Sequence, residues 1–223
     1  MSLDEFQVGH TVNELYDVIQ YVGQGGMGSV VKARRLRDGE IVAMKYCHLS
    51  EPSALQRFAR EVRIMRDIEH AHVVPILDMS LEHDPPYFVM PFASETCATK
   101  IPDYASDDAL AVDAFLQLCE GLQAIHNAGA VHRDVKPDNA LILGGRVVVS
   151  DLGLAKLLDR DSTPLTATGA VVGTRDYIAP EQMMPGGSRD ADVRTDIYQL
   201  GKTLYQMLTG LSPALVPNQA YFL

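Results

Sequence analysis

The sequence has few cysteines, fewer basic than acidic residues and no long apolar run. Its three cysteines (Cys47, Cys97 and Cys119) are odd in number and irregularly spaced, so neither a disulfide framework nor a zinc cluster is indicated. Nineteen lysines and arginines against 29 aspartates and glutamates leave a net charge of −10, which argues against a nucleic-acid-binding surface. No stretch approaches the roughly 20 apolar residues of a membrane span. The first 17 residues also lack the pattern of a signal peptide. We therefore expect a cytoplasmic protein, or the cytosolic domain of a larger one, with no nucleic-acid partner and no membrane segment.

The length and composition of the chain are those of a globular protein of one or two domains. It has 223 residues, of which 47% are hydrophobic and 22% charged, with a mean hydropathy of −0.01. Short alternating runs separated by glycine-rich or Asp-Gly turns predict an antiparallel meander in the first part. Two further runs predict strands, and apolar residues three or four apart predict a helix between residues 53 and 69. The five expected strands span residues 16–22, 30–37, 40–46, 73–79 and 87–92.

After Phe92 the pattern becomes mainly helical. A helix is expected over residues 108–128 and another over 195–209, each followed by a glycine suited to a helix end. Between them, residues 141–149 predict a strand pair around Gly144-Gly145, and residues 152–192 are rich in loop-forming residues. We expect an α+β chain of two lobes. Residues 1–92 would form a small antiparallel sheet with one helix, and residues 93–223 a larger, mainly helical part.

A glycine-rich segment follows the first expected strand. It reads Gly23-Gln24-Gly25-Gly26-Met27-Gly28-Ser29-Val30 and fits the pattern G-x-G-x-x-G-x-V. Dinucleotide-binding folds also carry G-x-G-x-x-G, but there the glycines open a helix. Here the residues that follow alternate as in a strand, which favours a hairpin flap that lies over phosphates. An ordinary glycine-rich turn stays an alternative for this segment alone.

Lys45 ends the apolar strand segment Val42-Ala43-Met44-Lys45. A buried ammonium group must be paired, and Glu61 on the expected helix is the natural partner. The alternative is a surface lysine at a strand edge.

The segment His132-Arg133-Asp134-Val135-Lys136-Pro137-Asp138-Asn139 precedes Asp151-Leu152-Gly153 by a short interval. Together with the glycine motif, Lys45 and Glu61, it resembles the eukaryotic-type (Hanks-type) protein kinases. The residues within the motifs look like those of the bacterial Ser/Thr branch of that family. The resemblance covers residues 16–210. It implies a bilobal protein-kinase-like fold and an enzyme that transfers the γ-phosphoryl group of ATP to Ser/Thr hydroxyls of a protein substrate.

The resemblance also implies a role for each motif residue. Asp134 would accept the proton of the substrate hydroxyl, and Lys136 would stabilise charge on the transferred phosphoryl group. Lys45, held by Glu61, would contact phosphates. Asn139 and Asp151 would hold Mg²⁺, with Mn²⁺ as an alternative, while His132 would be a packing residue rather than a base.

Nucleotide contacts are implied in the flap and where the lobes join. Pro91 would offer its carbonyl and Ala93 its N–H to adenine, behind the gatekeeper Met90. The full expected set is Val22, Gly23, Gln24, Gly25, Gly26, Met27, Gly28, Val30, Ala43, Lys45, Met90, Pro91, Ala93 and Leu141.

Substrate class and regulation follow from the same resemblance. Lys136 and Thr174 go with Ser/Thr specificity, and the segment that ends at Glu181 forms a peptide-docking ledge in this family. In this family, an arginine directly before the catalytic aspartate, as Arg133 is here, usually goes with control by phosphorylation of the activation loop. We expect self-phosphorylation at Thr166 and Thr168, with a second copy of the chain as the partner in trans.

Two alternatives stay open. Family members continue through several further helices, one of which supplies an arginine that pairs with the equivalent of Glu181, so the second lobe is expected to be truncated. A nucleotide-binding, pseudokinase-like module is therefore the alternative to an active kinase. A small-molecule kinase is disfavoured by Thr174 and by Ala179-Pro180-Glu181.

Overall fold

The structure, a computed structural model, describes residues 4–25, 28–151, 174–183 and 191–213. The chain divides into two compact units. Unit 1 comprises Met1–His70 and Val74–Ser94, and unit 2 comprises Ala71–Val73 and Glu95–Leu223. The division into kinase lobes at residues 92 and 93 stays a prediction.

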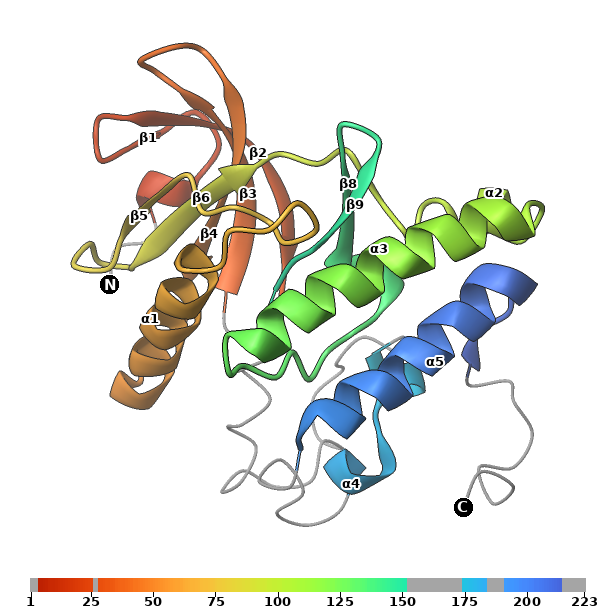
Figure 1. The fold of residues 1–223 in the computed structure, drawn as a ribbon. Coiled ribbons are helices and arrows are strands. Elements are labelled where there is room, and N and C mark those ends of the chain that lie inside the picture. The colour runs from red at the N-terminus through yellow and green to blue at the C-terminus, as the bar shows by residue number, and fades with distance from the viewer. Residues whose placement is uncertain (1–3, 26–27, 152–173, 184–190, 214–223) are drawn as a thin grey trace. The chain divides into compact units, whose positions relative to one another are not determined.

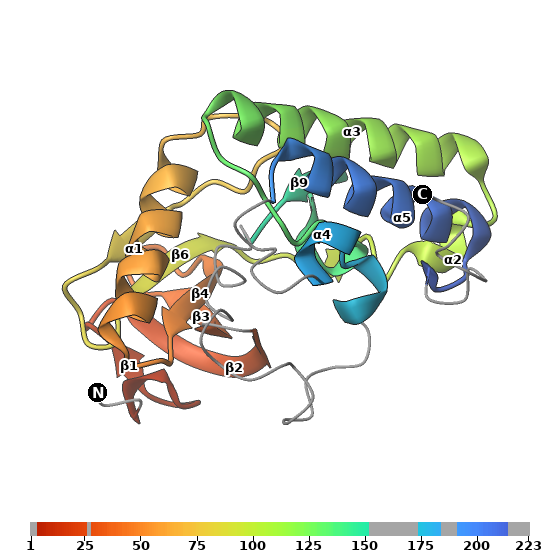
Figure 2. The same cartoon turned by 90° about the horizontal axis from the view of Figure 1, so that it is seen from below.

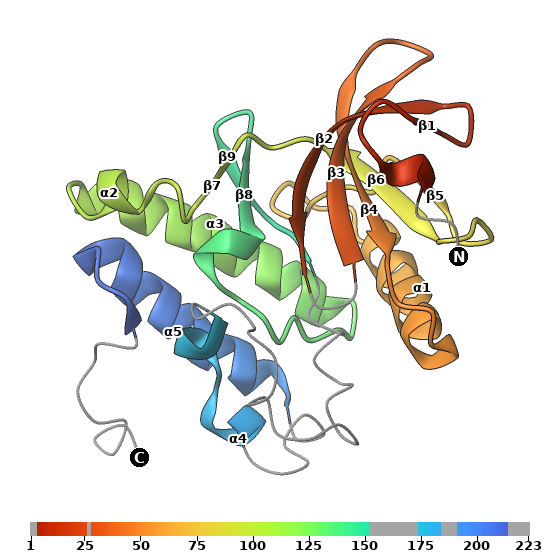
Figure 3. The same ribbon diagram turned by 180° about the vertical axis from the view of Figure 1, so that it is seen from behind.

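Unit 1 is built on a six-stranded antiparallel sheet with the order β1-β2-β3-β4-β6-β5, which Figure 3 shows from behind. Side chains alternate across it as expected for strands with one face buried: on β3, Val31 and Ala33 are buried while Lys32 is more exposed. Aromatic and branched side chains from these strands form the core of the unit. The strands are β1 (Thr11–Val12), β2 (Tyr16–Gln24), β3 (Gly28–Arg35), β4 (Ile41–Cys47), β5 (Asp78–Ser80) and β6 (Tyr87–Pro91), preceded by a 3₁₀ turn at Asp4–Phe6.

The helix of unit 1 is α1 (Pro52–Arg66), which confirms the helix expected over residues 53–69 with an earlier end. Proline suits its first turn because the N–H that proline lacks would have no helical partner there. Phe58, Val62 and Met65 are buried along one face, and Glu61 is buried with them. The helix thus carries a carboxylate into the apolar interior of the unit.

The strand expected over residues 73–79 is wrong for most of its length. Only Asp78–Ser80 (β5) pairs in the sheet of unit 1, whereas Val73 forms an isolated parallel bridge with Val149 in unit 2. Pro75 explains part of the difference, because proline has no N–H to donate to a ladder.

Unit 2 contains two long helices, α3 (Asp108–Asn127) and α5 (Val193–Thr209), which lie side by side (Figures 1 and 2). Both match the sequence-based expectation, and Gly129 and Gly210 follow them with positive φ of 74° and 70°. The Asp107 carboxylate caps α3 by accepting hydrogen bonds from the N–H groups of Ala109 and Leu110. Shorter elements complete the unit: α2 (Ile101–Tyr104), α4 (Pro180–Met183) and 3₁₀ turns at Pro137–Asn139 and Thr174–Tyr177.

The expected strand pair is present as β8 (Ala140–Leu143) and β9 (Arg146–Val149), joined by Gly144 and Gly145 at positive φ, with β7 (Glu95–Thr96) beside β8. β9 packs on α3, and Gly121 allows this close approach. A Cβ atom at residue 121 would lie 2.2 Å from the carbonyl oxygen of His72 and 2.8 Å from Cγ2 of Val149. Any side chain there would push the helix away from the hairpin.

In the part of the chain that the structure describes, no helix combines the length and apolar character needed to cross a bilayer.

Candidate active site

The β8–β9 hairpin brings two expected metal ligands to one end. Ala140 pairs with Val149 in the hairpin. One residue further, the Ser150 N–H donates a hydrogen bond of 2.9 Å to the carbonyl oxygen of Asn139. Asn139 and Asp151 therefore sit at neighbouring positions where the hairpin ends. Asp151 has a left-handed backbone with φ of 57°.

The Asp134 carboxylate lies between an amide and an ammonium group. Nδ2 of Asn139 donates to the main-chain oxygen of Asp134 at 2.8 Å and to its Oδ2 at 3.1 Å. Nζ of Lys136 lies 3.6 Å from the same Oδ2. Both members of this ion pair keep partial solvent access, at 15% and 16% of side-chain area for Lys136 and Asp134. The arrangement places a carboxylate, which can only accept hydrogen bonds when ionised, beside a cation and an amide donor.

His132 is fully buried, and backbone groups occupy both of its ring nitrogens. Nε2 lies 2.8 Å from the carbonyl oxygen of Ser150, to which it donates, while Nδ1 accepts from the N–H of Asp134 at 3.2 Å. A carbonyl can only accept and an N–H can only donate, so the imidazole is neutral with its proton on Nε2. This geometry supports the expectation that His132 holds the loop and does not act as a base.

Asp196 of α5 is also fully buried, and it holds the start of the loop that carries Asp134. Its Oδ2 accepts from the N–H of His132 at 2.8 Å and from Nε2 of His126 at 2.7 Å, and its Oδ1 accepts from the N–H of Arg133 at 2.6 Å. A buried carboxylate needs such donors, and the loop supplies two of them. Arg133 is held at a φ of 66°, a conformation that a residue with a side chain adopts at a cost.

Gln199, one turn further along α5, bridges both sides of Asp134. Its Oε1 accepts from the Val135 N–H at 2.8 Å, and its Nε2 donates to the Arg133 carbonyl at 3.1 Å and to Oε1 of Gln182 at 2.8 Å. Sequence analysis missed both Asp196 and Gln199. The available signal was polar residues at helical spacing among apolar ones such as Leu200 and Met207, on the face of α5 that is buried.

The segment expected to dock a peptide is anchored on α5. Lys202 donates from Nζ to the carbonyl oxygen of Asp176 at 2.6 Å, and the Tyr177 hydroxyl donates to the side chain of Gln206. Thr174 begins this 3₁₀ turn. Glu181 accepts a hydrogen bond from the Thr195 hydroxyl, a partner that sequence analysis did not identify. Thr166 and Thr168 lie outside the described residues.

In unit 1, the structure confirms the expected pairing of Lys45 with Glu61. Nζ of Lys45 lies 3.9 Å from Oε1 of Glu61, and their side chains are only 13% and 3% exposed. The alternative of a surface lysine at a strand edge is therefore wrong. The contribution of the pair to catalysis stays a prediction.

The glycine motif lies where β2 turns into β3, so a strand follows it and the dinucleotide-binding alternative, which needs a helix, is excluded. Gly28 is required by packing, because a Cβ there would lie 2.7 Å from the carbonyl oxygen of Tyr46. Among the described residues, a Cβ at Gly23 would meet no atom within 4 Å, and one at Gly25 none nearer than 3.8 Å. Packing against the described residues thus does not require glycine at these two positions. Gly26 and Met27 lie outside the described residues.

The expected adenine contacts of unit 1 fall on neighbouring strands. Ala43 of β4 lies opposite Met90 of β6, and each is 5% exposed. Val30 is opposite Lys45 in the β3–β4 register, and Pro91 ends β6. The remaining expected contacts are Val22, which is half exposed, Gln24 at the end of β2, Ala93 after β6 and Leu141 on β8 of unit 2.

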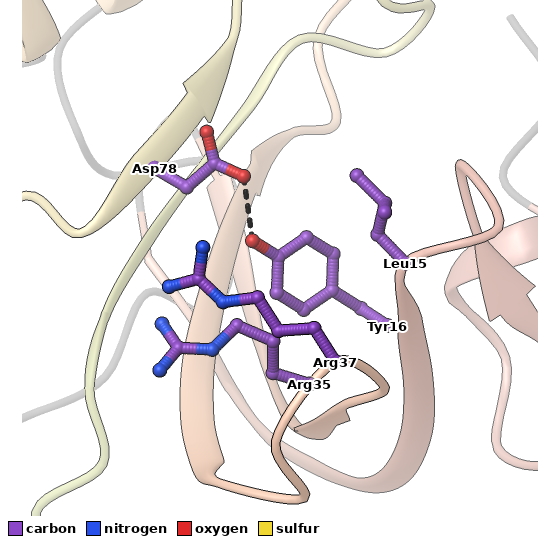
Figure 4. Close-up of a pocket in the computed structure, with 5 residues that line it drawn as sticks. All are labelled: Leu15, Tyr16, Arg35, Arg37 and Asp78. Atoms are coloured by element: carbon purple, nitrogen blue, oxygen red, sulfur yellow. Dashed lines mark hydrogen bonds between the residues drawn. The ribbon is translucent and has the colours of Figure 1, made fainter.

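Unit 1 has a further small pocket, drawn in Figure 4, beside Leu15 and Arg37. Its polar groups are already paired. The Tyr16 hydroxyl donates to Asp78 at 2.6 Å, and burial together with this bond raises the tyrosine pKa. Arg35 is bound to Asp38 and Glu40. Because these side chains already bind one another or neighbouring residues, we assign their contacts to stabilisation of the sheet and not to a ligand.

Within the described ranges, no three His, Cys, Asp or Glu side chains are grouped so as to hold a metal ion. Asn139 and Asp151 together offer an amide and a carboxylate. Because Nδ2 of Asn139 faces Asp134, its amide oxygen points away from that carboxylate. Two oxygen ligands suit a cation such as Mg²⁺, which usually completes its shell with phosphate oxygens and water.

Comparison with known proteins agrees with this geometry. The sequence profile of the protein kinase domain matches residues 16–220. The chain is 37% identical to the serine/threonine-protein kinase Pkn1 of Myxococcus xanthus over 206 residues, which are 89% of this chain and 29% of that protein. It is 37% identical over 227 residues to PknD of Chlamydia pneumoniae, covering 88% of this chain and 24% of the relative. The probable serine/threonine-protein kinase PknB of Corynebacterium glutamicum is 32% identical over 215 residues. This match covers 91% of this chain and 32% of the length of PknB.

The chain thus spans about a third or less of the length of these curated relatives. Protein kinases use ATP together with divalent metal ions. The profile match over most of the chain, the bacterial relatives, the sheet with a single helix in unit 1 and the Asp134 loop in unit 2 lead to one assignment. The chain belongs to the protein kinase family, in the bacterial branch of its Hanks-type serine/threonine members.

Proposed function

We propose that this chain transfers the γ-phosphoryl group of ATP to Ser or Thr hydroxyls of a protein substrate and acts in the cytoplasm. The observation that carries the proposal is the Asp134 carboxylate with Lys136 Nζ at 3.6 Å and Asn139 Nδ2 at 3.1 Å. A base, a cation and a metal-ligating amide within one short loop are what phosphoryl transfer to a hydroxyl needs.

In the proposed reaction, the hydroxyl oxygen of the substrate forms a bond to the γ-phosphorus while the bond from that phosphorus to the β,γ-bridging oxygen breaks. ADP leaves, and the hydroxyl proton passes to the carboxylate of Asp134. Lys136 stabilises the charge that spreads over the transferred oxygens, and Lys45, oriented by Glu61, holds phosphate oxygens of ATP.

Asn139 and Asp151 would hold Mg²⁺, or Mn²⁺ in its place. When bound, the ion neutralises phosphate charge as the bond to the leaving group breaks. Gly23 and Gly25 would let backbone N–H groups approach the phosphates, and the expected adenine contacts of β3, β4 and β6 would pack on the base.

The test is ATP turnover with a generic Ser/Thr protein acceptor. Asp134→Asn keeps the shape of the side chain and removes the proton acceptor, so transfer should fall by about 10²- to 10⁴-fold. Asp113→Asn, the same change at an exposed position of α3, should leave transfer unchanged. Equal transfer by wild type and Asp134→Asn would contradict the proposal. If neither transfers phosphate and both bind ATP, the chain is a nucleotide-binding module.

We also propose that the chain phosphorylates itself at Thr166 and Thr168, in trans through a second copy, with Arg133 as a partner for the added charge. Mass spectrometry after incubation with ATP should find phosphate at these threonines in wild type only. Equal phosphate on Asp134→Asn made in the same host would contradict self-phosphorylation.

A further inference from the structure

Gln199 is the one side chain among the described residues that hydrogen-bonds the backbone on both sides of Asp134. Its Oε1 accepts from the N–H of Val135, the residue after Asp134, and its Nε2 donates to the carbonyl of Arg133, the residue before. These two groups belong to the two peptide planes that flank Asp134. The orientation of these planes sets φ and ψ of Asp134, and therefore the direction of its carboxylate.

The orientation of the Gln199 amide is dictated by its partners. A backbone N–H must meet the oxygen end, and a carbonyl must meet the nitrogen end. The second hydrogen of Nε2 goes to Oε1 of Gln182 at 2.8 Å. Gln182 is itself fixed, because it accepts from the N–H of Ala179 at 3.1 Å and donates to the Arg133 carbonyl at 3.0 Å. Gln199 is fully buried, so water does not replace these bonds.

We propose that Gln199 is a positioning residue for phosphoryl transfer, which fixes the Asp134 carboxylate and couples it to α4. This inference rests on the proposed function. Asp196 holds the N–H groups of His132 and Arg133, but none of its hydrogen bonds reaches the backbone beyond Asp134. Gln199 does reach it, and through Gln182 it connects the loop to the segment expected to dock the peptide. A change in α4 would therefore be transmitted to the direction of the proton acceptor.

The first test is Gln199→Met, which keeps the length of the side chain and removes all of its hydrogen bonds to the loop. Displacement of a reacting group by an ångström costs about 10²-fold in rate, so kcat should fall by about 10- to 100-fold while KM for ATP stays unchanged. Thr203→Val is the matched control. Thr203 is equally buried one turn along α5 and donates only to the carbonyl of Gln199, so kcat should stay within about twofold of wild type.

The variant Gln199→Glu distinguishes an effect of the lost hydrogen bonds from an effect of altered packing at this position. A buried carboxyl has a raised pKa, and its protonated form offers one acceptor and one donor in the same places as the amide. The ratio of its kcat to that of wild type should therefore rise as the pH falls from about 8 to about 6, whereas the ratio for Gln199→Met should stay flat. The neighbouring titratable and charged groups are the same in both proteins, so their own pH dependence is common to both: His126, His132, Arg133, Asp134, Glu181 and Asp196.

Amide hydrogen exchange over residues 131–139 of the full chain gives a readout that does not need activity. The Val135 N–H should be protected in wild type and in Thr203→Val, and should exchange faster in Gln199→Met. Equal protection in Gln199→Met, or an unchanged kcat in that folded variant, would overturn the positioning role. Loss of kcat that matches the unfolded fraction measured by circular dichroism would also overturn it. An inactive wild type with faster exchange in Gln199→Met would contradict the proposed function alone.

Discussion

At the scale of single residues, the contact of unit 1 that bears most on the proposed reaction is the pair of Lys45 and Glu61. Glu61 is 3% exposed, and the Lys45 ammonium 3.9 Å away is a partner of opposite charge for its buried carboxylate. An ammonium held by a carboxylate has fewer orientations than one on a free four-carbon chain. The pair therefore determines where the lysine charge lies before a nucleotide binds.

Glu61→Gln should lower kcat by about 10- to 100-fold, because the lysine loses the charge that orients it while the packing volume is kept. Steady-state kinetics with ATP and a protein acceptor measures the change, with Glu69→Gln on the exposed stretch after α1 as control. A kcat within about twofold of wild type would show that Lys45 is oriented without Glu61.

A second residue-scale prediction concerns pH. Nε of Arg35 donates to both carboxylate oxygens of Asp38 at 3.0 Å, and this bond lowers the pKa of Asp38 to about 2. In the unfolded chain the pKa is about 4, so the folded state favours the ionised form. The stabilisation is complete above pH about 4 and is lost as the pH falls towards 2.

Asp38→Asn should therefore destabilise the protein at neutral pH, and its difference from wild type should shrink as the pH falls below about 4. Urea midpoints at several pH values measure this, with Asp113→Asn as the control for loss of one negative charge. A difference that does not vary with pH would mean that the ion pair does not stabilise the fold.

At the scale of elements, the contact of α3 with β9 depends on a missing side chain. Gly121→Ala would place a methyl group against the His72 carbonyl and Val149, so it should destabilise by about 1–3 kcal/mol. Gly201→Ala on α5 is the matched control, because a Cβ there meets no described atom within 4 Å. Alanine is the better helix former, so this variant should gain up to about 1 kcal/mol. Chemical denaturation measures both, and equal effects would refute the packing argument.

Local sequence patterns predicted some elements of this structure correctly and others wrongly. The β8–β9 hairpin was predictable because Gly144 and Gly145 suit positive φ and the flanking residues are apolar. The Lys45–Glu61 pair was predictable because a lysine in an apolar strand needs a partner. The strand expected over residues 73–79 failed because an apolar run does not say which sheet it joins, and Val73 pairs with Val149 in the other unit.

Asp196 and Gln199 were missed for a different physical reason. Each forms hydrogen bonds with the loop that carries Asp134, at separations of 63 to 66 positions in the chain. Local spacing identifies helix faces, but it does not say what a polar side chain on the buried face will meet. Only the packing of α5 against the loop reveals the partner.

At the scale of the whole molecule, charge limits the partners. A net charge of −10 repels a polyanion. A fluorescent single-stranded DNA should therefore show no change in anisotropy up to about 10 μM protein at near-physiological salt. Saturable binding that weakens with added salt would reveal a local basic patch that the overall charge hides.

The burial of Asp196 has a consequence for how such a chain drifts over generations. Its three hydrogen bonds hold the backbone at the start of the loop that carries Asp134, whereas the role we propose for the Asp134 carboxylate is in phosphoryl transfer. A descendant released from selection for transfer could replace Asp134 with little harm, but replacing Asp196 would leave its backbone donors buried and unpaired. Among descendants of this chain, an aspartate at position 196 would thus mark a folded domain, and under the proposed function only the one at position 134 would mark a working enzyme.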